Sequence, residues 1–276
     1  MIDLHTHSTF SDGTYSPQEL IKLAYENNIK AIAITDHDTI DGISYAIPEA
    51  EKFNIELING IEISADYKGI EIHILGYFLD IKNTKLLNLL KDLEKTRNKR
   101  NQDLINKLNE IGINISLDYV KSLSPLGLVT RAHFGKAIAE KGYTKNIKEA
   151  FNIYLGKGKP AYIKRTLIPY DQAIKIILES NGIPVLAHPM IYKLSNNDLD
   201  IAIKELMQAG LKGIECYYPS NTLKQTNTLL SMCEKYNMKI TGGSDFHGDN
   251  RPDVSLGNIF LGKQIDYKIL EDLKNI

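Results

Sequence analysis

The chain has 276 residues, of which 43% are hydrophobic, and its formal net charge is -1, an ordinary globular composition that suffices for one large domain or two smaller ones. No run of about 18 or more apolar residues is present and the first residues lack a secretion signal, so we expect a cytoplasmic protein with no membrane partner. Cys216 and Cys233 have no closely spaced cysteine partner, so neither a zinc ribbon nor a disulfide framework is indicated.

Short runs rich in Ile and Val follow the apolar start of the chain and alternate with amphipathic helical patterns, which is typical of parallel strands joined by helices. The predicted strands are at 30–35, 55–60, 69–78, 183–188, 212–218 and 239–245. The alternation within 69–78 is only partial and predicts a strand near a sheet edge. Ser16 and Glu19 form a capping box at the start of one helix, and another begins near Pro169 and ends before Gly182.

The alternation of strands and helices stops between about Asp92 and Arg165. A long charged helix, "KLLNLLKDLEKTRNKRNQDLINKLNEIG", leads into further helical pieces. Residues 91–165 contain 16 Lys and Arg against 7 Asp and Glu, and the remainder of the chain is acidic. This basic segment is either a solvated surface or a wall that faces an anionic substrate. We therefore expect one α/β barrel, residues 1–91 and 166–276, interrupted by a helical, basic, substrate-covering subdomain at 92–165.

Histidines and carboxylates follow the predicted strands. In a (β/α) barrel the C-terminal ends of the strands meet on one face, so residues far apart in sequence lie together there. The candidate metal ligands are His5, His7, Asp12, His37, Glu62, His73, His188, Asp245 and His247. These are side-chain types that bind Zn²⁺, Mn²⁺ and Fe²⁺. Since a catalytic ion takes about three protein ligands, nine ligands predict two or three divalent metal ions.

Each ligand has a structural alternative when it is considered alone. A single histidine after a strand is commonly a hydrogen-bonded structural residue, Glu62 could cap a helix, and Asp12 in "SDG" could form a turn. Asp36 and Asp38 in "TDHD" are candidate helix caps. The joint pattern favours metal, because this many imidazoles and carboxylates in one layer would otherwise leave adjacent buried charges unpaired.

Six motifs, "DLHTHSTFSDG", "ITDHDTIDG", "GIEIS", "IHILGY", "LAHP" and "GGSDFHG", together resemble the PHP (polymerase and histidinol phosphatase) family and span the chain. The resemblance implies a distorted (β/α)7 TIM-like barrel with two or three Mn²⁺, Fe²⁺ or Zn²⁺ ions. It assigns His5, His7, Glu62 and Asp245 to one ion. Glu62, as a bridging ligand, would hold a second ion with His73 and His188, and Asp12, His37 and His247 would hold a third.

The stretches "LVTRAHFGKAIAEKGY" and "YLGKGKPAYIKR" resemble the stand-alone branch of the family that removes the 3'-phosphate of nucleoside 3',5'-bisphosphates. Some members of that branch also trim RNA from its 5' end. The resemblance implies that Arg131 and His133 hold substrate phosphate, and that His133 either binds it or protonates the leaving group. Further candidates for substrate binding are Lys157, Lys159, Lys164 and Arg165. The expected substrate is a nucleotide or short RNA, and no protein partner is evident.

Three other functions stay open. The first is a phosphatase of the same family that acts on histidinol phosphate or another small molecule, and the "TRAHF" insertion weighs against it. An amidohydrolase also begins with His-x-His on a barrel strand, but that class usually bridges its metals with a carbamylated lysine, and no lysine ends a predicted core strand here. A metal-binding or nucleic-acid-binding module without activity is the third alternative, since a basic segment alone is compatible with RNA binding.

Overall fold

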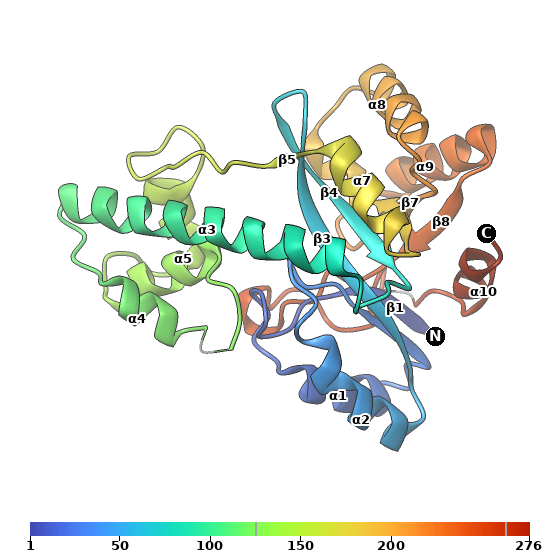
Figure 1. Ribbon diagram of the computed structural model, residues 1–276, viewed down its shortest axis with the longest axis horizontal. Coiled ribbons are helices and arrows are strands. Elements are labelled where there is room, and N and C mark those ends of the chain that lie inside the picture. Colours follow the sequence, from blue (N-terminus) through green and yellow to red (C-terminus); the bar gives the residue numbers. More distant parts are fainter. Residues whose placement is uncertain (125, 263) are drawn as a thin grey trace.

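A curved, nearly closed sheet forms the centre of the computed structural model, which describes residues 1–124, 126–262 and 264–276 (Figure 1). The strands are β1 (Ile2–Thr6), β2 (Ala31–Ile34), β3 (Glu56–Tyr67), β4 (Ile70–Tyr77), β5 (Ile168–Pro169), β6 (Ile183–Leu186), β7 (Gly213–Tyr217) and β8 (Lys239–Gly242). Their order is β1-β2-β3-β4-β6-β7-β8, with β5 paired to β3. Past the end of β8, Asp245 N donates to His5 O at 2.8 Å and His7 N donates to Phe246 O at 3.0 Å. The predicted distorted seven-stranded barrel is confirmed.

Strand β4 corrects one sequence-based prediction. It lies between β3 and β6 and is antiparallel to both, so it is not an edge strand and the sheet is not parallel throughout. The reason is local: Lys68 and Gly69 both have positive φ, 51° and 86°, as a two-residue hairpin turn requires. This turn folds β4 directly back onto β3.

Strand β3 is twice as long as predicted and changes partners along its length. Residues 56–59 pair with β2, whereas residues 60–67 pair with β4. Glu62 therefore lies inside the strand and does not follow it, so it caps no helix. A buried carboxylate in the middle of a central strand is costly unless other groups satisfy it.

Helices cover the sheet. They are α1 (Pro17–Glu26), α2 (Ile43–Phe53), α3 (Thr84–Glu110), α4 (Leu117–Ser122), α5 (Arg131–Glu140), α6 (Ile147–Ala150), α7 (Tyr170–Glu179), α8 (Asn196–Gln208), α9 (Leu223–Tyr236) and α10 (Lys268–Lys274), with short π or 3-10 turns at Phe151–Leu155, Pro189–Tyr192 and Gly248–Asn250. The predicted capping box is confirmed, since Ser16 N donates to Glu19 Oε2 at 2.7 Å and Glu19 N donates to Ser16 Oγ at 3.2 Å. The helix expected after Pro169 is α7. In the described residues, no helix is both long and apolar enough to cross a membrane.

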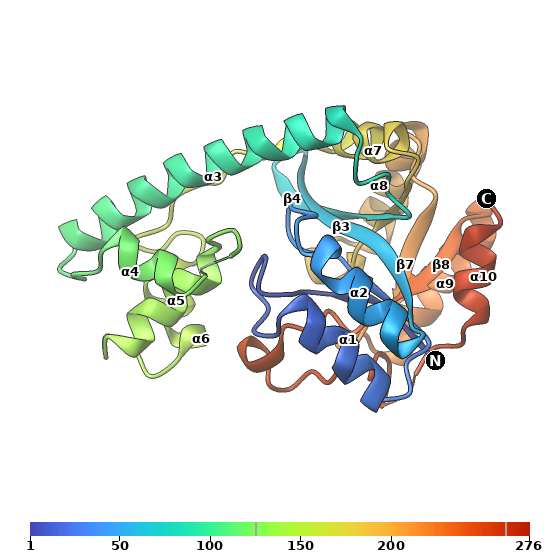
Figure 2. The same ribbon diagram turned by 60° about the horizontal axis from the view of Figure 1, so that its bottom comes forward.

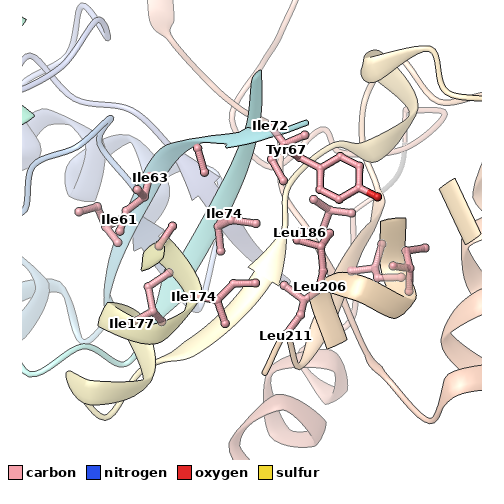
Figure 3. Close-up of a cluster of buried hydrophobic side chains, with 14 of the residues drawn as sticks. Ile61, Ile63, Tyr67, Ile72, Ile74, Ile174, Ile177, Leu186, Leu206 and Leu211 are labelled. Atoms are coloured by element: carbon pink, nitrogen blue, oxygen red, sulfur yellow. The ribbon is translucent and has the colours of Figure 1, made fainter. Parts of the chain in front are cut away.

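The largest buried apolar cluster joins the outer face of β3, β4 and β6 to helices α7 and α8 (Figure 3). Ile61 and Ile63 on β3 and Ile74 on β4 pack with Ile174 and Ile177 of α7. A separate cluster fills the helical segment, with Leu104 and Leu108 of α3 packed among residues of α4, α5 and the turn after α6. The helical segment therefore has a core of its own.

Helix α3 connects these two clusters as one continuous rod that extends away from the barrel (Figures 1 and 2). Leu86 and Leu90 belong to the barrel-side cluster, and Leu104 and Leu108 belong to the cluster of the helical segment. Figure 2 shows α4, α5 and α6 gathered beside the far end of α3. The predicted boundary at residue 92 falls inside this helix, and the division into two parts remains a prediction.

Candidate metal centre and substrate pocket

The structure brings all nine predicted ligands together from six strands or the loops that follow them. Their ligand atoms form four groups within which all atoms lie within 4.8 Å of one another. The groups are His7, Asp12, His37 and His247; His5, His7 and Asp245; His5, Glu62 and His188; and His37, Glu62 and His73. Buried clusters of this kind can hold several metal ions. The sequence-based assignment paired His73 with His188, whereas these groups join His188 to His5 and His73 to His37.

Glu62 lies at the centre of the cluster and is fully buried. Its Oε1 is 2.9 Å from His73 Nδ1 and 2.9 Å from His188 Nε2. Its Oε2 is 2.9 Å from His37 Nδ1 and 3.4 Å from His7 Nε2. One carboxylate thus faces imidazoles on both of its oxygens, which is the arrangement that a ligand shared between two ions requires.

Several of these polar atoms are buried without a hydrogen-bond partner in the described structure: Asp12 Oδ1, His37 Nδ1, Glu62 Oε2 and His188 Nδ1. His37 Nδ1 and Glu62 Oε2 are close, but their geometry does not make a hydrogen bond. His5 Nε2 and His7 Nε2 are 3.1 Å apart, close to the separation of two nitrogens that each lie about 2.1 Å from one ion. The donor set therefore fits divalent metal ions.

Burial and contacts between imidazoles and carboxylates set the charge states of the cluster. Burial, together with the neighbouring His247 and His37, lowers the pKa of His7 to about 3, so this imidazole is neutral. Although burial raises the pKa of Glu62, the imidazoles of His73, His37 and His5 hold it well below its usual range. Neutral imidazoles and ionised carboxylates are the forms that bind metal ions, and His7 and Glu62 have them. His73 differs: although burial lowers its pKa, Glu62 raises it to about 10.

Glu215 is a functional residue that sequence reasoning missed. It lies in β7, is fully buried, and its Oε1 is 2.9 Å from His5 Nδ1. Its Oε2 accepts a hydrogen bond from the His188 backbone N–H at 2.7 Å. A carboxylate behind a ligating histidine sets the tautomer and orientation of the ring. The only signal in the sequence is a charged residue within the apolar strand "GIECYY".

The carboxylates of "TDHD" are not helix caps, since α2 begins after Gly42. Asp36 accepts hydrogen bonds from Ser8 N at 2.7 Å and from Ser11 Oγ at 2.5 Å, which ties the loop after β1 to the loop after β2. Asp38 Oδ2 instead forms ion pairs with Arg97 of α3 and with Arg165. Asp38 therefore connects the barrel to both ends of the helical segment.

The two carboxylate oxygens of Asp245 have different partners. Its Oδ1 is 3.1 Å from His7 Nε2, while its Oδ2 accepts a hydrogen bond from Tyr218 OH at 2.7 Å and pairs with Arg251. Gly243 in "GGSD" has no room for a side chain, because a Cβ there would lie 2.2 Å from Cβ of His5. Only glycine allows the chain to pass this close to β1.

Four arginines surround a cavity of about 250 Å³ above the cluster. It is lined by Asp12, His37, Ser64, Glu71, His73, Arg97, Arg100, Thr130, Arg131, Ala132, Phe151 and Arg165. Metal-ligand candidates thus form one part of the wall and guanidinium groups another. Arg97 and Arg100 were missed from sequence, because they belong to a charged helix that reads as solvent-exposed. Such a pocket suits a phosphate-bearing ligand.

Arg131 lines this pocket, and its guanidinium lies 5.4 Å from the centre of the Tyr162 ring. His133 is buried and lines a different cavity, of about 310 Å³, together with Thr14 and Lys136. Its Nδ1 accepts a hydrogen bond from the Thr130 backbone N–H at 3.0 Å and so completes a capping box of α5. Only Nε2 of His133 is left to face a substrate.

The lysines predicted to bind substrate are exposed. Lys164 lines a third cavity, of about 500 Å³, which shares Glu71, Arg131 and Arg165 with the arginine pocket. Lys157 and Tyr162 line this cavity too. Lys159 lines none of the cavities described above, so its role in binding remains a prediction.

Comparison with known proteins places this geometry in a family. A family model described as PHP domain matches residues 3–165. The chain is 36% identical over 264 residues to a protein named 5'-3' exoribonuclease from Haemophilus influenzae, covering 96% of this chain and 94% of that relative. It is 29% identical over 256 residues to a 3',5'-nucleoside bisphosphate phosphatase from Chromobacterium violaceum, covering 92% and 90%. A solved structure of an amidohydrolase from Chromobacterium violaceum, with bound sulfate and no metal, matches with a TM-score of 0.88 and 28% identity, covering 98% of this chain and 96% of that chain.

Proposed function

This chain belongs to the PHP domain family and is a metal-dependent phosphoesterase, and we propose that its substrates are nucleotides: it removes the 3'-phosphate of nucleoside 3',5'-bisphosphates and trims short RNA from the 5' end. The observation that carries the proposal is the pocket in which Arg97, Arg100, Arg131 and Arg165 face Asp12, His37 and His73. A phosphate ester that reaches these ligands is surrounded by guanidinium groups, which bind phosphate oxygens in pairs.

The nine ligands would hold two or three divalent ions, with Glu62 shared between them. Support comes from the unpartnered lone pairs of Glu62 and Asp12 and from the close approach of His5 to His7. When bound, such ions supply Lewis-acid polarisation of a phosphoryl oxygen and a water nucleophile that is active at neutral pH. Mn²⁺, Fe²⁺ and Zn²⁺ all suit a mixed imidazole and carboxylate set.

The residues of the helical segment would bind and orient the substrate, which is the substrate-covering role proposed for residues 92–165. Arg131 offers two parallel N–H donors to a phosphate. His133 is suited to donate a hydrogen bond through Nε2, because its Nδ1 is occupied by the Thr130 N–H and because burial, followed by Lys136 and Arg97, lowers its pKa although Asp12 raises it. A neutral histidine of this tautomer favours phosphate binding over proton donation to the leaving group.

The larger cavity beyond Arg131 favours RNA as a second substrate. Its volume is about 500 Å³, and Lys157, Lys164 and Tyr162 are among the residues that line it. Lysines attract a phosphodiester backbone, and a partly exposed aromatic ring such as that of Tyr162 can stack a base. Histidinol phosphate, the alternative small substrate, would leave this basic cavity without a function. An amidohydrolase reaction is the weaker alternative, because that class usually bridges its metals with a carbamylated lysine, whereas Glu62 faces imidazoles with both oxygens here.

The test is phosphate release from adenosine 3',5'-bisphosphate by Mn²⁺-loaded protein, with histidinol phosphate and a 5'-phosphorylated RNA oligomer in parallel. We expect phosphate and 5'-AMP from the bisphosphate. Arg131→Ala should weaken turnover of the bisphosphate more than that of a small aryl phosphate, while Lys121→Ala, an exposed site in the same segment, should change neither. Turnover of histidinol phosphate alone would leave the metal centre intact and contradict the nucleotide substrate.

A further inference from the structure

The loop after β8 brings an arginine back to the candidate ligand that precedes it. In "SDFHGDNRP", Asp245 comes before the short 3-10 turn Gly248–Asn250, and Arg251 follows the turn. Gly248 has a φ of 62°, and a Cβ there would lie 2.1 Å from Thr14 Oγ1, so the turn requires glycine. Arg251 N donates to Gly248 O at 3.0 Å, and its Nη1 donates to Asp245 O at 3.4 Å. The turn therefore fixes the guanidinium beside Asp245.

Tyr218, Arg251 and one oxygen of Asp245 form a compact unit. Asp245 Oδ2 accepts a hydrogen bond from Tyr218 OH at 2.7 Å and pairs with Arg251, whose Nη1 is 3.2 Å from Tyr218 OH. The other oxygen, Oδ1, lies between 3.1 and 3.5 Å from a ring nitrogen of each of three candidate ligands: His5, His7 and His247. The two oxygens thus have separate tasks, one toward the ligand cluster and one toward its support.

The support is itself held in place. Tyr218 follows β7 and is 3% exposed, and its ring lies edge-on to the ring of His188 with the centroids 5.4 Å apart. Packing therefore fixes the direction in which the hydroxyl points. Arg251 is only partly buried, but the closed turn restricts its backbone. A buried phenol and a tethered guanidinium both converge on Oδ2 of Asp245.

Asp245 needs such a support for two reasons. The terminal torsion of an aspartate side chain has a broad range, so an unsupported carboxylate can rotate and offer either oxygen or both. In addition, the backbone φ of Asp245 is 54°, a left-handed conformation that persists only where the surroundings impose it. Hydrogen bonds to Oδ2 restrict the carboxylate at the end of this backbone.

A role of Arg251 in substrate binding has less support. Arg251 is not among the residues that line the three cavities described above. Within the part of the chain that the structure describes, the carboxylate that pairs with Arg251 is that of Asp245. The contacts of this arginine therefore point to the metal centre and away from the arginine pocket.

We propose that Tyr218 and Arg251 are positioning residues of the metal centre: they engage Oδ2 of Asp245 and leave Oδ1 as the oxygen that a metal ion can bind. The inference rests on the proposed metal-dependent function and adds two residues that contact no ion themselves. A carboxylate that offers one oxygen keeps more coordination positions open for water and substrate than one that offers two. Residues that orient a ligand in this way typically change metal affinity by about 10–100-fold when they are removed.

The sign of the effect separates positioning from simple charge balance. Loss of Arg251 removes a positive charge near the ligands, which by itself strengthens the attraction of a cation. Loss of its hydrogen bonds frees the carboxylate of Asp245, which weakens binding. Tyr218→Phe removes a neutral donor and keeps the ring, so it measures positioning without a change in charge.

The first experiment measures the dissociation constant of Mn²⁺ from metal-free protein, with free Mn²⁺ followed by electron paramagnetic resonance. We expect Tyr218→Phe and Arg251→Met to bind Mn²⁺ about 10–100-fold more weakly than the wild type. The controls are Tyr217→Phe, the neighbouring tyrosine, and Lys224→Met, an exposed charge at the start of α9, and both should bind as the wild type does. Unchanged affinity in Tyr218→Phe, or tighter binding in Arg251→Met, would overturn the proposal.

The second experiment asks whether both residues act through Asp245. Tyr218→Phe and Arg251→Met are each combined with Asp245→Ala, and the Mn²⁺ affinities are compared in a double-mutant cycle. Without the carboxylate there is nothing to position, so neither substitution should weaken binding further. A general loss of structure would instead weaken binding in both backgrounds. Full additivity of the losses would therefore contradict the proposal.

Arg251→Lys guards against a failure of Arg251→Met to fold. Lysine keeps the charge but lacks the planar fork that reaches both Asp245 and Tyr218, so Mn²⁺ affinity should fall to an intermediate value. The thermal unfolding midpoint of each metal-free variant shows whether it is folded. No substrate is used, so the result does not depend on the nucleotide. A wild type that binds no Mn²⁺ would overturn the metal centre and this inference together, whereas wild-type affinity in all variants would overturn this inference alone.

Discussion

Glu215 Oε1 lies 2.9 Å from Nδ1 of His5, on the side of the imidazole away from the candidate metal centre. His5 Nε2, on the other side, faces His7 at 3.1 Å and Glu62 at 3.5 Å. The buried carboxylate therefore holds His5 in the tautomer whose Nε2 lone pair is free for a metal ion.

Glu215→Gln should lower metal affinity by about 10–100-fold, because the amide holds the ring less firmly and adds no negative charge behind it. The affinity is measured by titrating metal-free protein with Mn²⁺ and following activity or bound metal. Glu234→Gln, at an exposed position of α9, is the matched control and should behave as wild type. Unchanged affinity in Glu215→Gln would mean that Glu215 has only a packing role.

Glu62→Gln and Asp12→Asn should differ in the amount of metal that they retain. Glu62 belongs to two of the ligand groups and approaches imidazoles with both oxygens, whereas Asp12 belongs to one group. Elemental analysis of purified protein should show the loss of more than one ion per chain in Glu62→Gln and of at most one in Asp12→Asn. Equal metal content in the two variants would rule out a shared position for Glu62.

Asp38→Asn should lower the free energy of unfolding by about 3–5 kcal/mol, because it removes the carboxylate partner of the buried Arg97 and leaves Arg165 with Glu71 as its carboxylate partner. Denaturant unfolding provides the measurement, and Asp41→Asn, three residues along and exposed, is the control. Adding Arg97→Met to Asp38→Asn should recover part of the loss. If the double variant is no more stable than Asp38→Asn, the ion pair is not the source of the effect.

Two substitutions separate the helix-capping role of His133 from its proposed role in substrate binding. His133→Ala removes both the cap of α5 and the Nε2 donor, and should lower stability by about 1 kcal/mol as well as bisphosphate turnover. Glutamine at this position can complete the capping box, so His133→Gln should keep the thermal midpoint and still lose about tenfold in kcat/KM. Full activity in His133→Gln would assign His133 to helix capping alone.

The barrel could be predicted from sequence because its signals are local. Runs of Ile and Val, capping residues and turn glycines each report on a few neighbouring positions, and together they indicate strands joined by helices. The direction of β4 was not predictable in this way. Its placement depends on the Lys68–Gly69 turn and on pairing with β6, which lies more than 100 residues later in the chain.

The sequence alone identified the nine candidate ligands of the site, since residues at or just after the C-terminal ends of barrel strands gather on one face. Only the tertiary structure decided what surrounds them. In the sequence, Glu215 reads as part of a buried strand, and Arg97 and Arg100 read as part of a solvated helix. In the structure, Glu215 contacts His5, and both arginines line the pocket beside the ligand cluster. Helix periodicity shows which residues share a face of the helix. It does not show what packs against that face, because this depends on long-range contacts such as that of Arg97 with Asp38, 59 residues apart.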